Sequence, residues 1–297
     1  MEIPLQKISD ARIEKSGVNL YMLRLDKIHH DISGNKWFKL KYNLEEAKRQ
    51  NKNTILTFGG AYSSHITATA AAGKEFGFKT IGIIRGDELN APPLPSALGR
   101  EKNKTLEFAE SCGMQLRFVS REKYKKFRTD PNQLINQSVN YYVLPEGGTN
   151  ALAVKGCAEI VSHINIPFDY ICCPAGTGGT IAGIISSLKE NQKAIGFSVL
   201  KGGEFLKSEI EKLLTSLLPP SKGELNTAYH FGGYAKHTPE FLKFISDFEK
   251  ENTIPLEQVY TGKMMFGIYD LIRKKYFEDG KTIIAVHTGG LQGRLSP

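Results

Sequence analysis

The chain has 297 residues, of which 40% are hydrophobic and 24% charged, a balance typical of a soluble globular protein and not of a disordered one. Lysine and arginine exceed aspartate and glutamate by 39 to 31, so the net charge is +8. The first residues lack a basic segment followed by an apolar one, and the longest uncharged run, 170–188, contains Pro174 and several glycines. These features argue against a secretory signal and a membrane span, and we expect a cytoplasmic protein.

The cysteines and the basic residues indicate neither a metal nor a nucleic-acid partner. The four cysteines, at positions 112, 157, 172 and 173, lack the spacing of metal ligands, and adjacent cysteines in an apolar run are typical of buried thiols. The densest basic cluster, 121–128, resembles a solvated helix face, because no zinc-finger, RRM or helix-turn-helix pattern accompanies it. We therefore expect no metal and no nucleic acid, whereas a mild excess of cations suits a small anionic ligand.

Short runs of β-branched residues alternate with longer runs of helical periodicity along most of the chain. In chain order, the predicted elements are an amphipathic run at 41–47, a strand at 54–58, a helix at 63–76, a strand at 79–84, a helix at 103–112, strands at 115–119 and 141–144, a helix at 150–164, a strand at 170–173, a helix at 180–188, a strand at 194–200, helices at 204–217, 238–251 and 264–276, and a strand at 282–286. This alternation predicts an α/β fold with mostly parallel sheets.

Glycine-rich turns follow four of the predicted strands, at 59–60, 147–148, 176–179 and 289–290. In open α/β sheets, ligands bind outside the carboxyl ends of the strands. The turns therefore predict that one rim of the sheets is the functional face.

The sharpest local pattern is the turn at 176–180, which follows a strand and precedes a helix. Glycines leave backbone N–H groups accessible there, the helix N-terminus adds partial positive charge, and threonine hydroxyls add donors, so the turn has the composition of a phosphate cup. It is not a Walker A loop, and it fits a dinucleotide fingerprint poorly because the third glycine would fall on Ile181. A tight strand–helix turn without a ligand is the structural alternative. The cup residues are Gly176, Thr177, Gly178, Gly179 and Thr180.

Lys36 lies in the segment Ser33-Gly-Asn-Lys36, and by itself it is one lysine among many, for which a solvated surface position is the ordinary expectation. A lysine becomes a useful nucleophile when it is partly desolvated near other cations, and Lys39 follows three residues later.

Six motifs in order carry a resemblance that covers nearly the whole chain. They are Ser33-Gly-Asn-Lys36 with Lys39-Leu40, Gly59-Gly-Ala-Tyr-Ser-Ser-His65, Pro145-Glu-Gly-Gly148, Gly176-Thr-Gly-Gly-Thr180, Val259-Tyr-Thr-Gly-Lys263 and His287-Thr-Gly-Gly290. With these motifs the chain resembles the 1-aminocyclopropane-1-carboxylate deaminase / D-cysteine desulfhydrase family, which belongs to the tryptophan-synthase-β-like, fold-type II enzymes that use pyridoxal 5′-phosphate.

The resemblance implies an architecture of two α/β domains with open, twisted, mostly parallel sheets, helices on both faces and the cofactor in the cleft between the domains. It places the small domain at 42–146, inserted in a large cofactor-binding domain of 1–41 and 147–297. It further implies a homodimer that acts on a small amino acid.

The resemblance also implies roles for individual residues. Lys36 matches the Schiff-base lysine, Lys39 a lysine near the cofactor phosphate, and the 176–180 turn the phosphate cup. Ser63 matches the serine that moves protons and helps to hold the substrate carboxylate. Five other residues match positions that bind the substrate: Asn35, Ser64, His65, Tyr234 and Tyr260. Of these, Tyr260 is also catalytic and Ser64 also lies near the cofactor. Thr261 matches the position that faces the pyridine nitrogen.

Plain structural interpretations remain for several of these residues. Ser63 and Ser64 could be an N-cap pair, Tyr260 a core tyrosine, and His287 is interpreted as a packing residue. The chain has Ser64 where the family usually has an asparagine that reaches the cofactor's 3′-oxygen.

Thr261 bears on the choice of reaction, because the deaminase branch of the family usually has glutamate there. A carboxylate would keep the pyridine nitrogen protonated, and a hydroxyl gives no such charge. We therefore expect α,β-elimination on a small amino acid such as D-cysteine, giving pyruvate, ammonia and sulfide. The alternatives are ring-opening deamination, a dinucleotide-dependent oxidoreductase and a ligand-binding protein that has lost catalysis.

Overall fold

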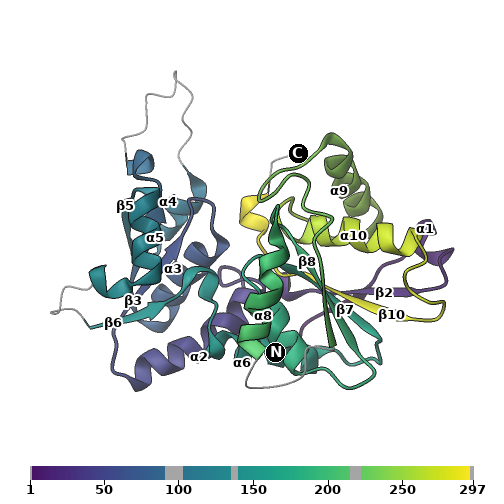
Figure 1. The fold of residues 1–297 in the computed structure, drawn as a ribbon, viewed down its shortest axis with the longest axis horizontal. Coiled ribbons are helices and arrows are strands. Elements are labelled where there is room, and N and C mark those ends of the chain that lie inside the picture. The colour runs from purple at the N-terminus through teal and green to yellow at the C-terminus, as the bar shows by residue number, and fades with distance from the viewer. Residues whose placement is uncertain (1, 91–102, 135–139, 215–221, 295–297) are drawn as a thin grey trace. The chain divides into compact units, whose positions relative to one another are not determined.

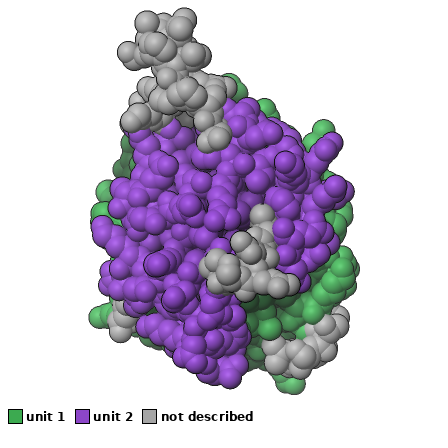
Figure 2. All heavy atoms as spheres, turned by 90° about the vertical axis from the view of Figure 1, so that its left-hand side faces the viewer, with its two compact units in different colours: residues 1–39, 150–297 green, residues 40–149 purple. Residues whose placement is uncertain are grey.

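The computed structural model describes residues 2–90, 103–134, 140–214 and 222–294 (Figure 1). The chain forms two compact units, residues 1–39 with 150–297 and residues 40–149, which Figure 2 shows in green and purple. The boundaries of 42–146 for the small domain stay a prediction.

The first unit, residues 1–39 and 150–297, is built on a six-stranded sheet in the order β1-β2-β10-β7-β8-β9. All neighbouring strands pair in parallel except β1 and β2, which are antiparallel. The strands are β1 (Leu5–Lys7), β2 (Asn19–Leu23), β7 (Tyr170–Ala175), β8 (Lys193–Ser198), β9 (Gly223–Asn226) and β10 (Thr282–Val286).

Helices cover both faces of this sheet, because its central strands are buried on both sides. In β10, Ile284 lies in one hydrophobic cluster with α6 and α7, and Ile283 lies in another with α9 and α10, as the two-residue period of a strand requires. The predicted α/β class with mostly parallel strands is confirmed. The helices are α1 (Ala11–Glu14), the start of α2 (Asn35–Arg49), α6 (Ala151–Ala158), α7 (Gly179–Ser186), α8 (Leu206–Leu214), α9 (Pro239–Asn252) and α10 (Thr261–Arg273).

The second unit, residues 40–149, has a parallel four-stranded sheet in the order β5-β4-β3-β6. One hydrophobic cluster joins α3 and α4 to the sheet, and another packs Tyr124 of α5 beside Phe58 of β3. The basic cluster at 121–128 is an exposed helix around the buried Tyr124, as predicted. The elements are the rest of α2, β3 (Thr54–Gly59), α3 (Ser64–Phe76), β4 (Lys79–Arg85), α4 (Lys104–Ser111), β5 (Met114–Val119), α5 (Arg121–Thr129) and β6 (Tyr141–Leu144).

The structure differs from the predicted elements in the first part of the chain and in three interior segments. The elements β1, α1, β2 and β9 were not predicted, and α2 begins at Asn35, so Lys36 lies in its first turn. The predicted helix at 150–164 is α6 followed by a 3₁₀ segment, Glu159–His163. The helix predicted at 204–217 is a 3₁₀ turn followed by α8 (Leu206–Leu214), and its last three predicted residues lie outside the described ranges.

Three cysteines, Cys157, Cys172 and Cys173, are buried free thiols, as their apolar surroundings predicted. Among the helices of the described ranges, none is both long enough and apolar enough to cross a membrane.

Candidate active site

The first turn of α2 is placed by a close contact of two glycines in the first unit. Gly34 has a φ of +69°, and a Cβ there would lie 2.0 Å from the Thr288 carbonyl oxygen. Gly289 has a φ of +79°, and its Cβ would lie 3.1 Å from the Gly34 Cα. Only glycine allows this approach, so the motif that ends at Lys36 packs directly on the motif that follows β10.

A hydrogen-bond chain runs from Lys36 to the phosphate cup. The Lys36 Nζ donates to the Asn35 side-chain oxygen at 2.8 Å, and the Asn35 amide donates to the Thr180 hydroxyl at 2.7 Å. Burial, with the neighbouring Lys39 ammonium, lowers the pKa of Lys36 to about 7. Lys36 is therefore not an ordinary surface lysine, because a large share of its amine is neutral near pH 7.

The cup itself joins β7 to α7. Gly178 precedes α7 in the left-handed conformation, with a φ of +79°. The Lys39 Nζ donates to the Thr177 hydroxyl at 3.4 Å, and burial lowers the pKa of Lys39. The predicted cup residues, Lys36 and Lys39 thus lie together in one unit.

The two cup glycines have different neighbours. A Cβ on Gly178 would lie 2.9 Å from the Ile210 side chain on α8, so this glycine supplies a left-handed turn packed on the core. A Cβ on Gly176 would lie 3.1 Å from the Tyr260 ring. A side chain at Gly178 would therefore first meet Ile210, whereas one at Gly176 would first meet Tyr260.

Glu257, which the sequence patterns did not reveal, organises the start of α10. Its buried carboxylate accepts from the backbone N–H groups of Val259, Tyr260 and Thr261, at 2.6, 2.8 and 2.5 Å. Burial raises the pKa of this carboxyl, and those hydrogen bonds oppose the rise. The predicted helix begins only at Met264, so the sequence pattern left Glu257 in a loop. An acidic residue just before a helix start was the signal that could have indicated its role, because carboxylates are favourable there.

Thr261 is fully buried, and its hydroxyl both donates a hydrogen bond to Glu257 and accepts one from it. Its hydroxyl donates to the Glu257 carboxylate at 3.0 Å and accepts from the Glu257 backbone N–H at 3.4 Å. The proton of the Thr261 hydroxyl is thus already committed, and only oxygen lone pairs are left for a ligand.

Tyr260 and Tyr234 meet beside the cup. Their rings pack edge to face with centroids 5.9 Å apart, and Tyr260 is half-buried, which disfavours its interpretation as a core tyrosine. Tyr234 is 43% exposed. These rings form an aromatic wall next to Gly176.

His287 is a packing residue, as interpreted from the sequence. It is fully buried, its Nδ1 accepts from the Gly289 backbone at 3.2 Å, and its Nε2 lies 2.8 Å from the Pro255 carbonyl oxygen. Since Nδ1 accepts, the proton is on Nε2, and burial lowers the pKa of the imidazole. The buried ring fixes the turn that contacts Gly34, and the Asp26 carboxylate, 3.5 Å from Nδ1, opposes the lowering of its pKa.

The remaining predicted residues lie together in the second unit, at the start of α3. Ser63 is the N-cap residue, yet its side chain makes no capping hydrogen bond, which argues against a role only as a cap. His65 is buried, with its Nε2 2.7 Å from the Thr57 hydroxyl, which itself donates to the Leu144 carbonyl oxygen. Ser63 and Ser64 are half-buried residues.

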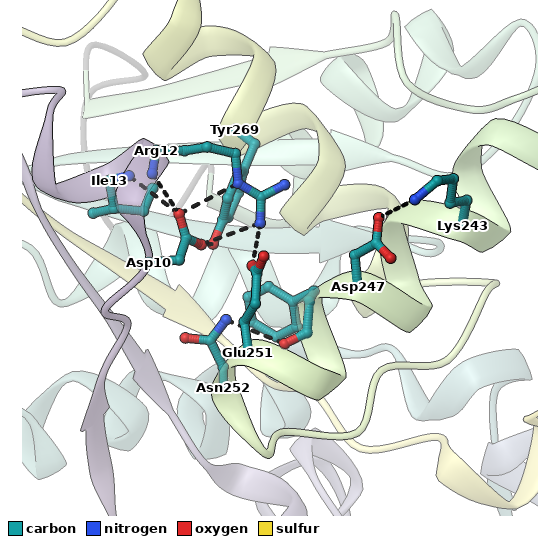
Figure 3. Close-up of polar contacts among 9 residues, drawn as sticks. Asp10, Arg12, Ile13, Lys243, Asp247, Glu251, Asn252 and Tyr269 are labelled. Carbon is teal, nitrogen blue, oxygen red and sulfur yellow. Dashed lines mark hydrogen bonds and ion pairs between the residues drawn. The ribbon is translucent and has the colours of Figure 1, made fainter.

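A second polar cluster, on α1, α9 and α10, is structural. Figure 3 shows Asp10, which caps α1, accepting from Arg12 and from the Tyr269 hydroxyl, while Arg12 also pairs with Glu251. Arg12, Glu251 and the nearby pair of Lys243 and Asp247 are solvent-exposed ionic contacts. The cluster ties the chain's first helix to its last two.

The charges around the cup suit an anion. Lys39 brings an ammonium group to the cup, where its Nζ lies 3.4 Å from the Thr177 hydroxyl, and the Lys36 amine is joined to the cup through Asn35. An amine with a pKa of about 7, joined to a cup of backbone N–H groups and hydroxyls, can bind a ligand with a carbonyl at one end and a phosphate at the other.

Comparison with known proteins gives the class of this chain. The family model described as "Pyridoxal-phosphate dependent enzyme" matches residues 2–289. The chain is therefore a pyridoxal-phosphate-dependent enzyme with the fold-type II architecture.

Its relatives define the family more narrowly. The chain is 30% identical to a putative 1-aminocyclopropane-1-carboxylate deaminase of Pyrococcus horikoshii, over 98% of this chain and 90% of the relative. It is 31% identical to the bifunctional D-cysteine desulfhydrase/1-aminocyclopropane-1-carboxylate deaminase, mitochondrial, of Arabidopsis thaliana, over 94% of this chain and 74% of the relative. A crystal structure of an ACC deaminase homologue superimposes with a TM-score of 0.83 and 28% identity, covering 99% of this chain and 90% of that one. The chain belongs to the 1-aminocyclopropane-1-carboxylate deaminase / D-cysteine desulfhydrase family.

Proposed function

We propose that this enzyme catalyses α,β-elimination on a small amino acid such as D-cysteine, in which one water is consumed and pyruvate, ammonia and hydrogen sulfide are released. The observation that carries the proposal is the hydrogen-bond chain from Lys36 through Asn35 to Thr180. It joins an amine with a pKa of about 7 to a phosphate cup, which a pyridoxal-phosphate enzyme requires. The family relatives support the substrate class, since the Arabidopsis thaliana relative is a bifunctional D-cysteine desulfhydrase/1-aminocyclopropane-1-carboxylate deaminase.

The residues in this structure fit the cofactor. Lys36 would hold its carbonyl carbon through Nζ, with Asn35 orienting that nitrogen. The cup from Gly176 to Thr180, with Lys39, would hold its phosphate. Bound pyridoxal phosphate supplies an electron sink for the charge that develops at the substrate Cα.

The protein's own groups then handle binding and protons. Lys36 is an amine whose pKa of about 7 suits it to accept and return a proton near that pH. Ser63 has a hydroxyl that α3 does not use for capping, and we propose that it helps to move this proton. Ser64, His65 and Asn35 are proposed to bind the substrate.

Tyr260 and Tyr234 complete the proposed assignment. Their edge-to-face wall next to Gly176 would contact the substrate side chain, with Tyr260 also acting catalytically. A homodimer, a cytoplasmic location and the facing of Thr261 toward the pyridine nitrogen stay predictions.

Ring-opening deamination of 1-aminocyclopropane-1-carboxylate is the second candidate. The observation in its favour is Glu257, because a buried carboxylate lies one hydrogen bond behind Thr261. A negative charge there would favour protonation of a ring nitrogen facing Thr261, and would thereby weaken the sequence argument against this reaction.

The deciding experiment measures kcat/KM for D-cysteine, L-cysteine and 1-aminocyclopropane-1-carboxylate on one preparation of holoenzyme. The elimination proposal expects D-cysteine to give the largest value, with sulfide and pyruvate in equal amounts. A larger value for the cyclopropane substrate, with 2-oxobutanoate as product, would establish the second candidate instead. Borohydride reduction and peptide mapping should place the pyridoxyl group on Lys36, and finding it on Lys39 or Lys41 would overturn the assignment of the site.

A further inference from the structure

A buried lysine on α10 takes no part in the proposed function. Lys263 is fully buried in the first turn of the helix, where the aligned peptide dipoles repel a cation. Burial lowers its pKa to about 8, and the charge of Glu257 opposes that change. A buried ammonium group at this end of a helix is unfavourable unless its N–H groups donate hydrogen bonds to nearby acceptors.

Those partners are two carbonyl oxygens of one short segment. The Lys263 Nζ donates to the His230 oxygen at 2.9 Å and to the Gly233 oxygen at 2.7 Å. We call residues 230–235 the strap. Lys263 thus bridges two carbonyl groups of the strap, three residues apart, and acts as a clamp on its backbone.

The strap is strained and is anchored on the same helix. Phe231 and Ala235 have φ values of 52° and 56°, in the left-handed region that residues other than glycine seldom adopt. The Phe231 ring stacks on Phe241 at 4.4 Å and packs edge-on to Phe266 of α10 at 5.0 Å. Such a backbone persists only where neighbouring groups hold it.

The strap presents Tyr234 to the aromatic wall. Tyr234 directly follows the Gly233 carbonyl that Lys263 binds, and its ring meets that of Tyr260, which immediately precedes α10. Lys263 and Tyr260 therefore approach the strap from the same end of one helix.

We propose that Lys263 is a positioning residue that holds Tyr234 against Tyr260 and so determines how tightly the amino-acid substrate is bound. The proposal rests on the proposed function for the identity of the substrate, whereas the clamp on the strap is independent of it. Lys263 touches neither the 176–180 cup nor Lys36 in any contact that the structure gives, so cofactor binding should not depend on it.

The test compares the wild-type holoenzyme with the Lys263→Met holoenzyme. Lys274→Met serves as a matched control, because Lys274 lies at the exposed end of α10, where it pairs with Asp270. Hydrogen exchange of peptides covering 229–236 should accelerate about tenfold or more in Lys263→Met, because the carbonyls of His230 and Gly233 lose a charged donor, and should not change in the control. Cofactor absorbance and retention should stay as in the wild type. The KM for D-cysteine should rise about tenfold with kcat within about threefold, the pattern of lost binding.

Two further variants test the contact of Lys263 with the strap and its action through Tyr234 separately. Lys263→Gln has a shorter side chain with N–H donors that can reach one carbonyl, so its exchange rates should be intermediate; it also serves if Lys263→Met does not fold. In a double-mutant cycle with Tyr234→Ala, the two effects on KM should be strongly non-additive. Unchanged exchange in 229–236 would overturn the clamp, and additive effects on KM would overturn the action through Tyr234. If the wild type acted on no amino acid, the proposed function would be wrong. The hydrogen-exchange result would still show whether Lys263 holds the backbone of the strap.

Discussion

The hydroxyl of Thr261 donates a hydrogen bond of 3.0 Å to the carboxylate of Glu257, and both side chains are buried at the start of α10. The same carboxylate accepts backbone N–H groups from three consecutive residues. Glu257 therefore fixes the backbone of Tyr260 and the direction of the Thr261 proton at once. Any ligand beside Thr261 meets a hydroxyl oriented by a neighbouring acid.

The low pKa of Lys36 predicts how the stability of the apoprotein depends on pH. The folded-state pKa is about 7, whereas an unfolded lysine has a pKa of about 10.4, so between these values the unfolded chain binds more protons. The free energy of unfolding should therefore gain a contribution as pH rises from about 7 toward 10. Urea unfolding at pH 7 and pH 9 should show this gain in the wild type and a smaller one in Lys36→Met. An identical pH slope in the two proteins would mean that Lys36 is not desolvated.

The same pKa predicts the pH dependence of cofactor loading. Only the neutral amine attacks a carbonyl, so the rate of pyridoxal phosphate incorporation into apoprotein should increase with pH and level off above about pH 7. Stopped-flow absorbance would measure this profile. A rate that still climbs at pH 9 would indicate an ordinary lysine.

Two glycines of the cup, with the exposed Gly202 as a control, predict three distinct outcomes. Gly178→Ala should lower the free energy of unfolding more than Gly202→Ala, because both positions have left-handed φ values but only the first Cβ overlaps a neighbour, Ile210. Gly202→Ala should cost about 1 kcal/mol, the strain of the left-handed backbone alone. Gly176→Ala should change stability little and instead displace Tyr260, raising the KM of the amino acid. Urea unfolding and steady-state kinetics on all three variants would separate these effects, and equal stability losses for Gly178→Ala and Gly202→Ala would refute the overlap.

The strand–helix alternation was enough to predict the α/β class and most element positions, because parallel strands buried on both faces are continuous apolar runs. It was not enough for β1, which has only three residues, or for β2 and β9 at the outer parts of the sheet. The cup stood out through its glycine spacing, whereas Lys36 was assigned through the resemblance to the family.

Glu257 and Lys263 did not stand out, because a charged residue in a sequence is by default exposed. Their importance lies in burial and in partners far along the chain, such as the His230 carbonyl oxygen that Lys263 binds. The contact of Gly34 with Gly289 is likewise a product of the folded sheet.

The Asp10 cluster predicts a stability effect away from the active site. Tyr269→Phe removes the hydroxyl that Asp10 accepts from and should lower the free energy of unfolding by about 1–3 kcal/mol, because a mostly buried carboxylate loses a donor. Lys243→Met, which removes the exposed pair with Asp247, should cost at most about 1 kcal/mol. Chemical denaturation would compare the two variants, with turnover unchanged in both. A Tyr269→Phe protein as stable as the wild type would show that Arg12 alone satisfies Asp10.

Thr261 and Glu257 together predict the effect of introducing the deaminase-branch glutamate. Thr261→Glu alone should be poorly tolerated, because it places a second buried carboxylate beside Glu257, and two like charges in one site raise each other's cost of ionisation. Combining it with Glu257→Gln should recover part of the lost stability, since the amide can donate to the new carboxylate. The free energies of unfolding of the two single variants and the double variant should therefore show a coupling of about 1–3 kcal/mol. If the double variant holds the cofactor, its ratio of kcat/KM for the cyclopropane substrate over D-cysteine should exceed that of the wild type. Additive stabilities would show that the side chains do not meet as they do here, and an unchanged ratio would show that position 261 does not choose the reaction.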